Sequence, residues 1–249
     1  MNRFSSQYAV PRVSPVVKIL LIVSAVVFLL TAILERTSGF NLTALLGFTP
    51  ARLLQGFIWQ PFTYVFLHAS FFHLLFNLLV IWTVGSELEE LWGRKTFLSY
   101  LVVCGLGAAL TYGVFSLVGI GPGAYQPVVG SSGIVYGLLL AYGILFGDRT
   151  MYFFMLFPMP ARYFVMLLGG IELVSSVLYA KDGTAHLAHL GGMLFGFLFL
   201  ASMARWRQRS KGDFKAKQIE KERQRRLKKA SHLKLVNHEI EKKDPKHWN

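Results

Sequence analysis

Six stretches of this chain are almost free of charged residues and are dominated by apolar side chains. A helix that crosses the hydrocarbon core of a bilayer needs about 20 such residues. We therefore predict an all-α, polytopic membrane protein with six transmembrane helices. The predicted helices cover approximately residues 16–34, 70–87, 96–117, 132–147, 161–178 and 186–203.

The charged residues are few and unevenly distributed. Only 16% of the chain is Asp, Glu, Lys or Arg, whereas a soluble domain carries about 25%. The formal net charge of +13 arises mainly after residue 204, where 16 Lys/Arg accompany 6 Asp/Glu. We therefore divide the chain into a membrane domain, residues 1–204, and a basic cytoplasmic tail, residues 205–249. The tail is most simply a topology anchor, with contact to anionic lipids as a second interpretation, and we expect no nucleic-acid partner.

The positions of the basic residues also predict the direction of the helices. Lys and Arg near helix ends are enriched on the cytoplasmic side of a membrane. If the N-terminus is cytoplasmic, 23 of the 26 Lys/Arg fall on that side, and only Arg36, Arg52 and Lys181 fall outside. Both termini are then cytoplasmic, which fits a bacterial inner membrane. The second, fourth and sixth helices consequently begin at the outer face.

The connections between the helices differ in character. Residues 35–67 are rich in aromatic side chains, so we expect this first outer loop to lie partly in the membrane. Residues 119–130 contain several Gly and Pro and are expected to form turns. Residues 151–157 are apolar but short and precede Pro158-Met159-Pro160, so we predict an interfacial segment there. A polar link at residues 181–183 follows the fifth helix.

Two residues near the outer helix ends suit nucleophilic chemistry. Ser132 opens the fourth helix, but a serine hydroxyl attacks only when a base takes its proton. His189, near the start of the sixth helix, is the candidate base. Small residues spaced by four let two helices approach closely in a bilayer, which would bring hydroxyl and imidazole together. The helix-packing residues are Gly133 and Gly137 on the fourth helix and Gly192 and Gly196 on the sixth.

Hydrogen-bond donors for an oxyanion also occur at this depth. His73 and Asn77 are spaced i, i+4 and therefore project from one face of the second helix. The backbone N–H of Ser132, at its helix start, is a further donor. Tyr136 lies one turn below Ser132, where its ring could stack on His189 and orient it.

Each of these residues also has a structural interpretation. A serine at a helix start is often an N-cap, and His73 and Asn77 could simply hold helices together. His186 precedes His189 by three residues and has no clear role of its own. The two glycine faces could mark dimerisation, although packing within the chain is favoured over it.

Ionisable residues elsewhere in the predicted helices are rare. Glu172 lies near the middle of the fifth helix, and we interpret it as a neutral, hydrogen-bonded carboxyl, with a proton relay as the lesser alternative. Glu89 and Arg94 are interpreted as a structural cluster at the cytoplasmic end of the second helix. No metal or cofactor is expected, because the chain lacks a His-Glu-x-x-His pattern and His186 and His189 have no matching third ligand.

Taken together, these motifs resemble the rhomboid family of intramembrane serine proteases. The resemblance covers about residues 16 to 204, including the Glu89-xxx-Gly93 end of the second helix. The first outer loop has Trp59-Gln60 where the family often has Trp-Arg, which leaves the local contacts of that loop open. The motifs that carry the resemblance are Gly130-Ser131-Ser132-Gly133, Ala188-His189-Leu190-Gly191-Gly192-xxx-Gly196 and His68-xxxx-His73-xxx-Asn77.

The resemblance implies a six-helix rhomboid-like bundle and a serine endopeptidase that cleaves transmembrane segments of other membrane proteins near the outer face. It implies a Ser132–His189 dyad without an acidic third member, acting through an acyl-enzyme. The supporting residues would be His73 and Asn77 in the oxyanion hole, Tyr136 against the base and His68 in a supporting polar role. The fifth helix is a candidate gate for substrates.

Two other functions are weighed against this one. A catalytically silent rhomboid-like protein that binds membrane clients typically lacks the serine or the histidine, and both are present here. A transporter requires ionisable residues across the membrane, whereas the polar residues of this chain cluster at one depth. The expected partners are therefore transmembrane protein substrates and the lipid bilayer.

Overall fold

The computed structural model describes residues 12–120, 122–153, 156–179 and 185–243, and the side chains of all of these except 210–216 and 223–243. The chain divides into two compact units, residues 1–200 and 201–249, which are described separately. The predicted link at residues 181–183 lies outside the described residues, as do Arg3 and the last six residues of the predicted tail. The predicted domain boundary at residue 204 falls inside the last helix.

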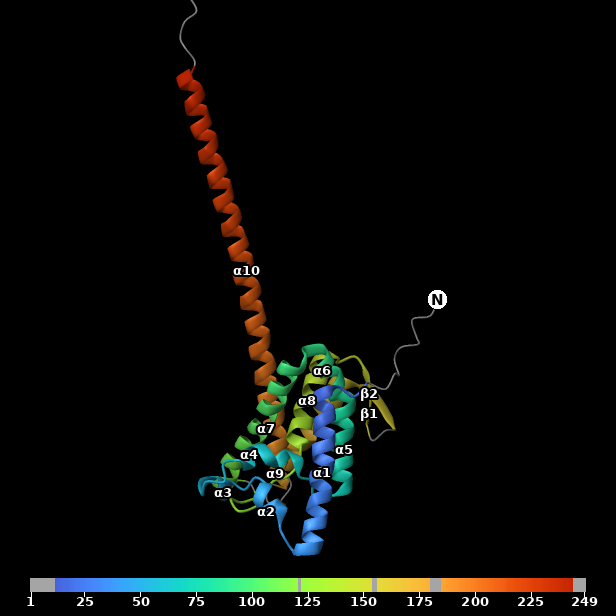
Figure 1. Cartoon of the computed structure of the whole chain (residues 1–249). Helices are drawn as coiled ribbons and strands as arrows, with labels where there is room; N and C mark the ends of the chain where they lie inside the picture. Colours follow the sequence, from blue (N-terminus) through green and yellow to red (C-terminus); the bar gives the residue numbers. More distant parts are fainter. Residues whose placement is uncertain (1–11, 121, 154–155, 180–184, 244–249) are drawn as a thin grey trace, which may run out of the picture. The chain divides into compact units, whose positions relative to one another are not determined.

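The first unit is a helical bundle (Figure 1). Within the described residues, five helices are long and apolar enough to cross a membrane, which confirms the all-α, polytopic class. The helix that begins at Ser132 is shorter, with 14 residues, about 21 Å at 1.5 Å per residue. The elements are α1 (Pro15–Ser38), α5 (Phe71–Val80), η2 (Ile81–Gly85), α6 (Ser86–Trp92), α7 (Arg94–Leu117), α8 (Ser132–Leu145), α9 (Ala161–Leu178) and α10 (His186–Lys243). Of these, α5, η2 and α6 form one continuous segment, Phe71–Trp92.

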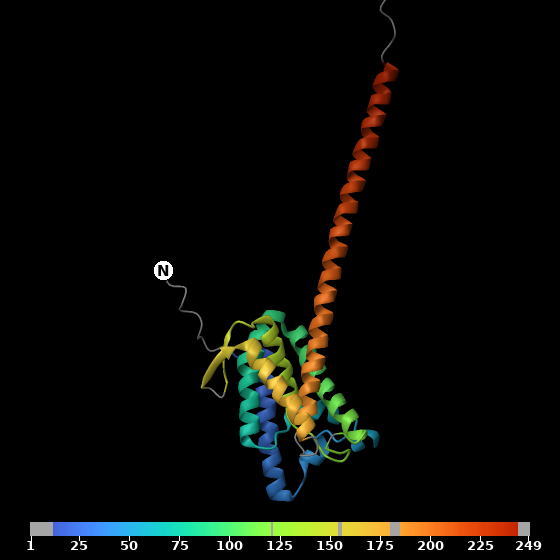
Figure 2. The same ribbon diagram turned by 180° about the vertical axis from the view of Figure 1, so that it is seen from behind.

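Helix α8 is the centre of the bundle. It contacts α5, η2, α7 and α9, and most of its side chains are buried. The outer helices α1 and α9 instead expose apolar side chains such as Ile19 and Val177, which is the surface expected to face lipid. Figure 2 shows the bundle from the side on which α9 runs. The short helix that carries Ser132 is therefore held on several sides.

The first connection is built from short helices rather than an irregular loop: α2 (Leu42–Leu46), α3 (Pro50–Leu54), α4 (Gln60–Thr63) and η1 (Tyr64–Phe66). It is tied to the segment that precedes α8. Phe48 and Val128 form an antiparallel bridge, and the Gly130 N–H donates to the Tyr64 carbonyl at 2.9 Å. The first connection thus fixes the approach to Ser132.

Gln60 replaces the arginine expected after Trp59, and the structure shows what it contacts. The Gln60 side chain is fully buried, accepts a hydrogen bond from the Thr49 N–H at 3.1 Å and donates to the carbonyls of Ala44 and Leu45 at 3.3 Å. The Trp59 indole donates to the Leu45 carbonyl at 3.0 Å. The neutral amide therefore satisfies the backbone of this connection without an arginine at that position.

Three features differ from the sequence-based expectations. The apolar stretch before the fifth helix forms a hairpin of β1 (Thr150–Phe153) and β2 (Phe157–Pro160), since two prolines exclude a helix there. Helix α10 continues past residue 203 to Lys243, because the tail is rich in Lys, Arg, Glu and Gln, which are strong helix formers. Glu89 does not pair with Arg94: it accepts from the Ser14 hydroxyl and from the backbone N–H groups that begin α1.

Candidate active site

Ser132 and His189 meet between α8 and α10. Ser131 is the N-cap residue of α8, and Ser132 is its first helical residue, so the Ser132 N–H has no intrahelical acceptor. The Ser132 Oγ lies 2.8 Å from Nε2 of His189, and both side chains are partly buried. The 57 residues that separate them in sequence are thus bridged by the packing of the two helices. A hydroxyl hydrogen-bonded to an imidazole is the arrangement needed for proton removal.

The close approach of α8 and α10 depends on glycine at two positions. A Cβ on Gly192 would lie 2.0 Å from the Gly133 carbonyl oxygen. A Cβ on Gly137 would lie 3.2 Å from the Gly192 carbonyl oxygen and also 2.5 Å from the Cys104 Sγ of α7. Gly196 packs elsewhere: a Cβ there would meet the Tyr100 hydroxyl of α7 at 2.6 Å. The expected docking face therefore consists of three of the four glycines, and Gly196 serves the α7–α10 contact instead.

Tyr136 stacks on the candidate base. The rings of Tyr136 and His189 are nearly parallel, at an interplanar angle of 11°, with centroids 4.5 Å apart. The Tyr136 hydroxyl also donates a hydrogen bond to Oε1 of Glu172 on α9. Tyr136 therefore contacts the imidazole with its face and a carboxylate with its edge, which restricts the rotation of both.

Glu172 is the residue of this site that the sequence analysis did not place. Its carboxylate is buried, and Oε2 lies 2.7 Å from Nδ1 of His186 and 3.0 Å from Nδ1 of His189. A tyrosine hydroxyl and two imidazole nitrogens surround this carboxyl group, which suits an ionised carboxylate, contrary to the neutral form expected from the sequence. The signal that could have located it was the pairing of an intramembrane acid with two histidines spaced i, i+3.

Glu172, His186 and His189 also form a group of three potential metal ligands. Ligand atoms of Glu172, His186 and His189 all lie within 4.8 Å of one another, so the third potential ligand that the sequence seemed to lack is supplied by α9. In this arrangement the carboxylate already faces protein donors, and Nε2 of His189 already faces Ser132. The geometry therefore favours a hydrogen-bonded network at these atoms.

His73 and Asn77 of α5 lie beside the segment that leads into α8. Gly130 has a φ of +113°, and a Cβ there would lie 2.6 Å from Cε1 of His73, so the imidazole rests directly on the glycine backbone. Asn77 is buried, and its Nδ2 has no hydrogen-bond partner in the described part of the chain. A buried amide donor without a partner is costly and is a feature expected of a site that awaits an acceptor.

His68 lies in the connection just before α5. Its Nε2 is 3.2 Å from the Ser131 Oγ, and its ring packs edge-on against His73 at 5.1 Å between centroids. Burial, followed by the neighbouring His73, lowers the pKa of His68 to about 4. His68 is therefore neutral at physiological pH and holds the N-cap serine rather than the nucleophile.

The fold and the site together define a polytopic membrane protein whose helices bring a serine and a histidine into hydrogen-bonding contact. The family model described as the Rhomboid domain matches residues 55–206, more than half of the chain. This chain therefore belongs to the rhomboid family.

Individual relatives have the following similarities. Rhomboid protein 1, mitochondrial, of Saccharomyces cerevisiae is 29% identical over 166 residues, which cover 65% of this chain and 43% of the yeast protein. Rhomboid protease GlpG of Haemophilus influenzae is 32% identical over 145 residues, 57% of this chain and 68% of that protease. Rhomboid protease GluP of Bacillus subtilis is 27% identical over 153 residues, 61% of this chain and 27% of that protease. The chain thus spans less than half the length of the yeast and Bacillus relatives.

Proposed function

We propose that this protein is an intramembrane serine endopeptidase that cleaves transmembrane segments of other membrane proteins. The observation that carries the proposal is the 2.8 Å contact between the Ser132 Oγ and Nε2 of His189. Relatives that bear the name rhomboid protease, GlpG and GluP, align with more than half of this chain and support the same activity.

In the proposed reaction, His189 takes the hydroxyl proton as Oγ of Ser132 attacks the scissile carbonyl. The resulting oxyanion is stabilised by the Ser132 backbone N–H, by the free Asn77 amide and by His73. His189 then gives its proton to the leaving amine, and water hydrolyses the acyl-enzyme. A helical substrate hides its carbonyls in its own hydrogen bonds, so a substrate segment must unwind locally. Small and helix-breaking residues are therefore expected near the cut.

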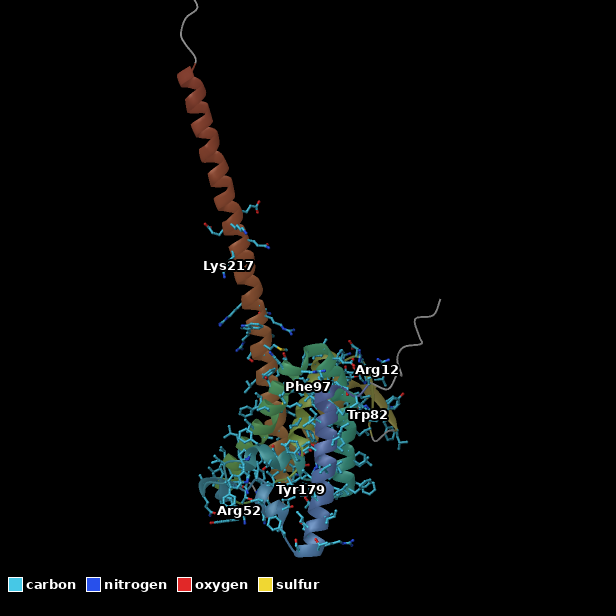
Figure 3. All side chains as sticks on the ribbon, in the orientation of Figure 1. Arg12, Arg52, Trp82, Phe97, Tyr179 and Lys217 are labelled. Atoms are coloured by element: carbon cyan, nitrogen blue, oxygen red, sulfur yellow. The ribbon has the colours of Figure 1, made fainter. Side chains whose placement is uncertain are left out.

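We further propose that the site opens toward the outer side and that both termini are cytoplasmic, as in a bacterial inner membrane. In the first unit, Arg12 and Phe97 lie at one end of the bundle and Arg52 and Tyr179 lie at the other (Figure 3). The end that holds Arg12 and Phe97 is also the end where α7 begins with Arg94 and Lys95. Basic residues are enriched on the cytoplasmic side of a membrane, which supports this orientation.

Cleavage of a fluorogenic transmembrane substrate in proteoliposomes tests the proposal. The wild-type protein is expected to cut, whereas Ser132→Ala and His189→Ala are expected to lose activity by at least about 10³-fold. A fluorophosphonate that labels the wild type and not Ser132→Ala would report the nucleophile without knowledge of the natural substrate. Equal cutting by wild type and Ser132→Ala would exclude this mechanism. A folded wild type with neither cutting nor labelling would favour the silent client-binding protein.

A further inference from the structure

The serine–histidine pair leaves one nitrogen of His189 without an assigned partner. To accept the Ser132 proton, Nε2 must be unprotonated, so the neutral ring carries its proton on Nδ1. That nitrogen is buried and makes no hydrogen bond within the described residues. Among the described residues, the anionic group beside this nitrogen is the Glu172 carboxylate, whose Oε2 is 3.0 Å away. The sequence position that could select the required tautomer is therefore Glu172.

The contact has the distance of an ion pair but is not yet aligned as a hydrogen bond. Catalytic hydrogen bonds are often poorly aligned before substrate binds and tighten in the complex. The carboxylate itself is well held, because Tyr136 donates to Oε1 and His186 contacts Oε2 at 2.7 Å. The stacked Tyr136 ring holds the imidazole beside this carboxylate.

A carboxylate beside His189 would also stabilise a positive charge on the imidazole. When Ser132 gives up its proton, His189 becomes an imidazolium, and a fixed negative charge in a poorly hydrated interior stabilises that cation strongly. Glu172 is 7% exposed at its side chain, so water screens the interaction little. The titratable groups that face His189 are Glu172 from α9, His186 from α10, Tyr136 from α8 and His73 from α5. Only Glu172 among them is an anion.

We propose that Glu172 is a positioning residue for His189, so that the site works as a Ser132–His189–Glu172 triad rather than as the dyad that the family resemblance implies. This inference rests on the proposed protease function. The proton taken from Ser132 stays on His189 until it passes to the leaving amine, and Glu172 remains ionised throughout. Helix α9 then contributes a residue to the catalytic site.

Labelling by a fluorescent fluorophosphonate, followed as a function of pH on the full-length protein in detergent, tests the triad. Glu172→Gln is expected to label about 10²-fold more slowly or worse, because an amide cannot balance the imidazolium. The acid limb of its pH–rate profile is expected to move down by about one pH unit or more, because the cation has lost its anionic neighbour. Glu172→Asp keeps the negative charge, so it should recover part of the labelling rate, and the acid limb of its pH–rate profile should lie at the wild-type position.

Ser176→Ala is the matched control. Ser176 lies one turn further along the same buried face of α9, and its hydroxyl donates only to the Leu173 carbonyl of its own helix. This variant should label at the wild-type rate. Thermal unfolding in the same detergent identifies folded variants, and Glu172→Asp carries the comparison if Glu172→Gln does not fold.

The outcomes separate this inference from the function on which it rests. If the wild type is not labelled, the proposed protease fails. If the wild type is labelled and Glu172→Gln matches it in rate and profile, the dyad stands and the triad is overturned. A slower Glu172→Gln with an unmoved acid limb would show a packing role and would also overturn it. So would loss of wild-type labelling on addition of a chelator, since a metal would then occupy the cluster.

Discussion

Gly192 of α10 lies against the backbone of Gly133 of α8, so closely that a Cβ at Gly192 would be 2.0 Å from the Gly133 carbonyl oxygen. This contact lies one turn below His189 on α10 and one residue after Ser132 on α8. The distance between nucleophile and base is therefore set by two residues that have no side chains. Close backbone approach through glycine is a common way to dock helices in a bilayer.

Gly192→Ala is expected to separate the two helices and to lower activity by about 10²-fold or more, because misplacement of a catalytic group by about 1 Å has an effect of that size. Overpacking should also reduce the free energy of unfolding by about 1–3 kcal/mol. Cleavage rates and thermal unfolding measure both effects. Gly170→Ala is the control, because a Cβ there meets nothing within 4 Å. Wild-type activity in Gly192→Ala would contradict the docking argument.

Gly130→Ala and Gly123→Ala form a second matched pair. Both glycines have a positive φ, +113° and +110°, so each substitution carries similar backbone strain of about 1–3 kcal/mol. Only Gly130 faces a side chain, because its Cβ would lie 2.6 Å from the His73 ring. We expect Gly130→Ala to lose at least about tenfold in kcat/KM by displacing His73 and Gly123→Ala to keep its activity. Equal losses would assign the effect to strain alone.

Asn77→Ala tests the oxyanion donor. Removal of one such donor typically lowers kcat by about 10²–10³-fold with little change in KM. The alternative, that Asn77 only holds helices together, predicts lower stability with an unchanged kcat. Separate measurement of kcat, KM and thermal unfolding distinguishes the two. Thr83→Ala is a suitable control, since its hydroxyl bonds only to the Leu79 carbonyl of its own segment.

The buried His68 should make stability depend on pH. Its pKa is lowered from 6.5 to about 4 in the folded protein, so the unfolded chain binds a proton more readily than the folded one between these values. The part of the free energy of unfolding that depends on His68 is then fully present above pH 6.5, declines as the pH falls and is lost near pH 4, by on the order of 3 kcal/mol. Thermal unfolding at pH 4–8 measures this, and His68→Gln, which keeps a neutral polar group, should flatten the profile. An unchanged profile in His68→Gln would contradict the assignment.

Most of the helices could be predicted from local pattern. The fifth was predicted at residues 161–178, and the structure has α9 at Ala161–Leu178, because a proline precedes the apolar run and a polar link ends it. The hairpin of β1 and β2 was missed, since four-residue strands next to two prolines have no distinct periodicity. The tail has modest helical character in its sequence, but its continuity with the sixth helix was not predicted, because a change from apolar to basic composition marks the end of a span and not the end of a helix.

The sequence by itself determined the membrane class, the membrane-spanning helices and the two residues proposed to react. Hydrophobic runs and glycine spacing can be recognised within one stretch of sequence, without knowledge of how the helices pack. The sequence left Glu172 as an isolated, neutral acid, and it assigned Gly196 to the wrong neighbour. Only the tertiary structure decided these points, because it brings Glu172 of α9 into contact with Tyr136 of α8 and His186 of α10. Periodicity shows which face of a helix is buried, whereas the partners on that face depend on how three separate helices pack.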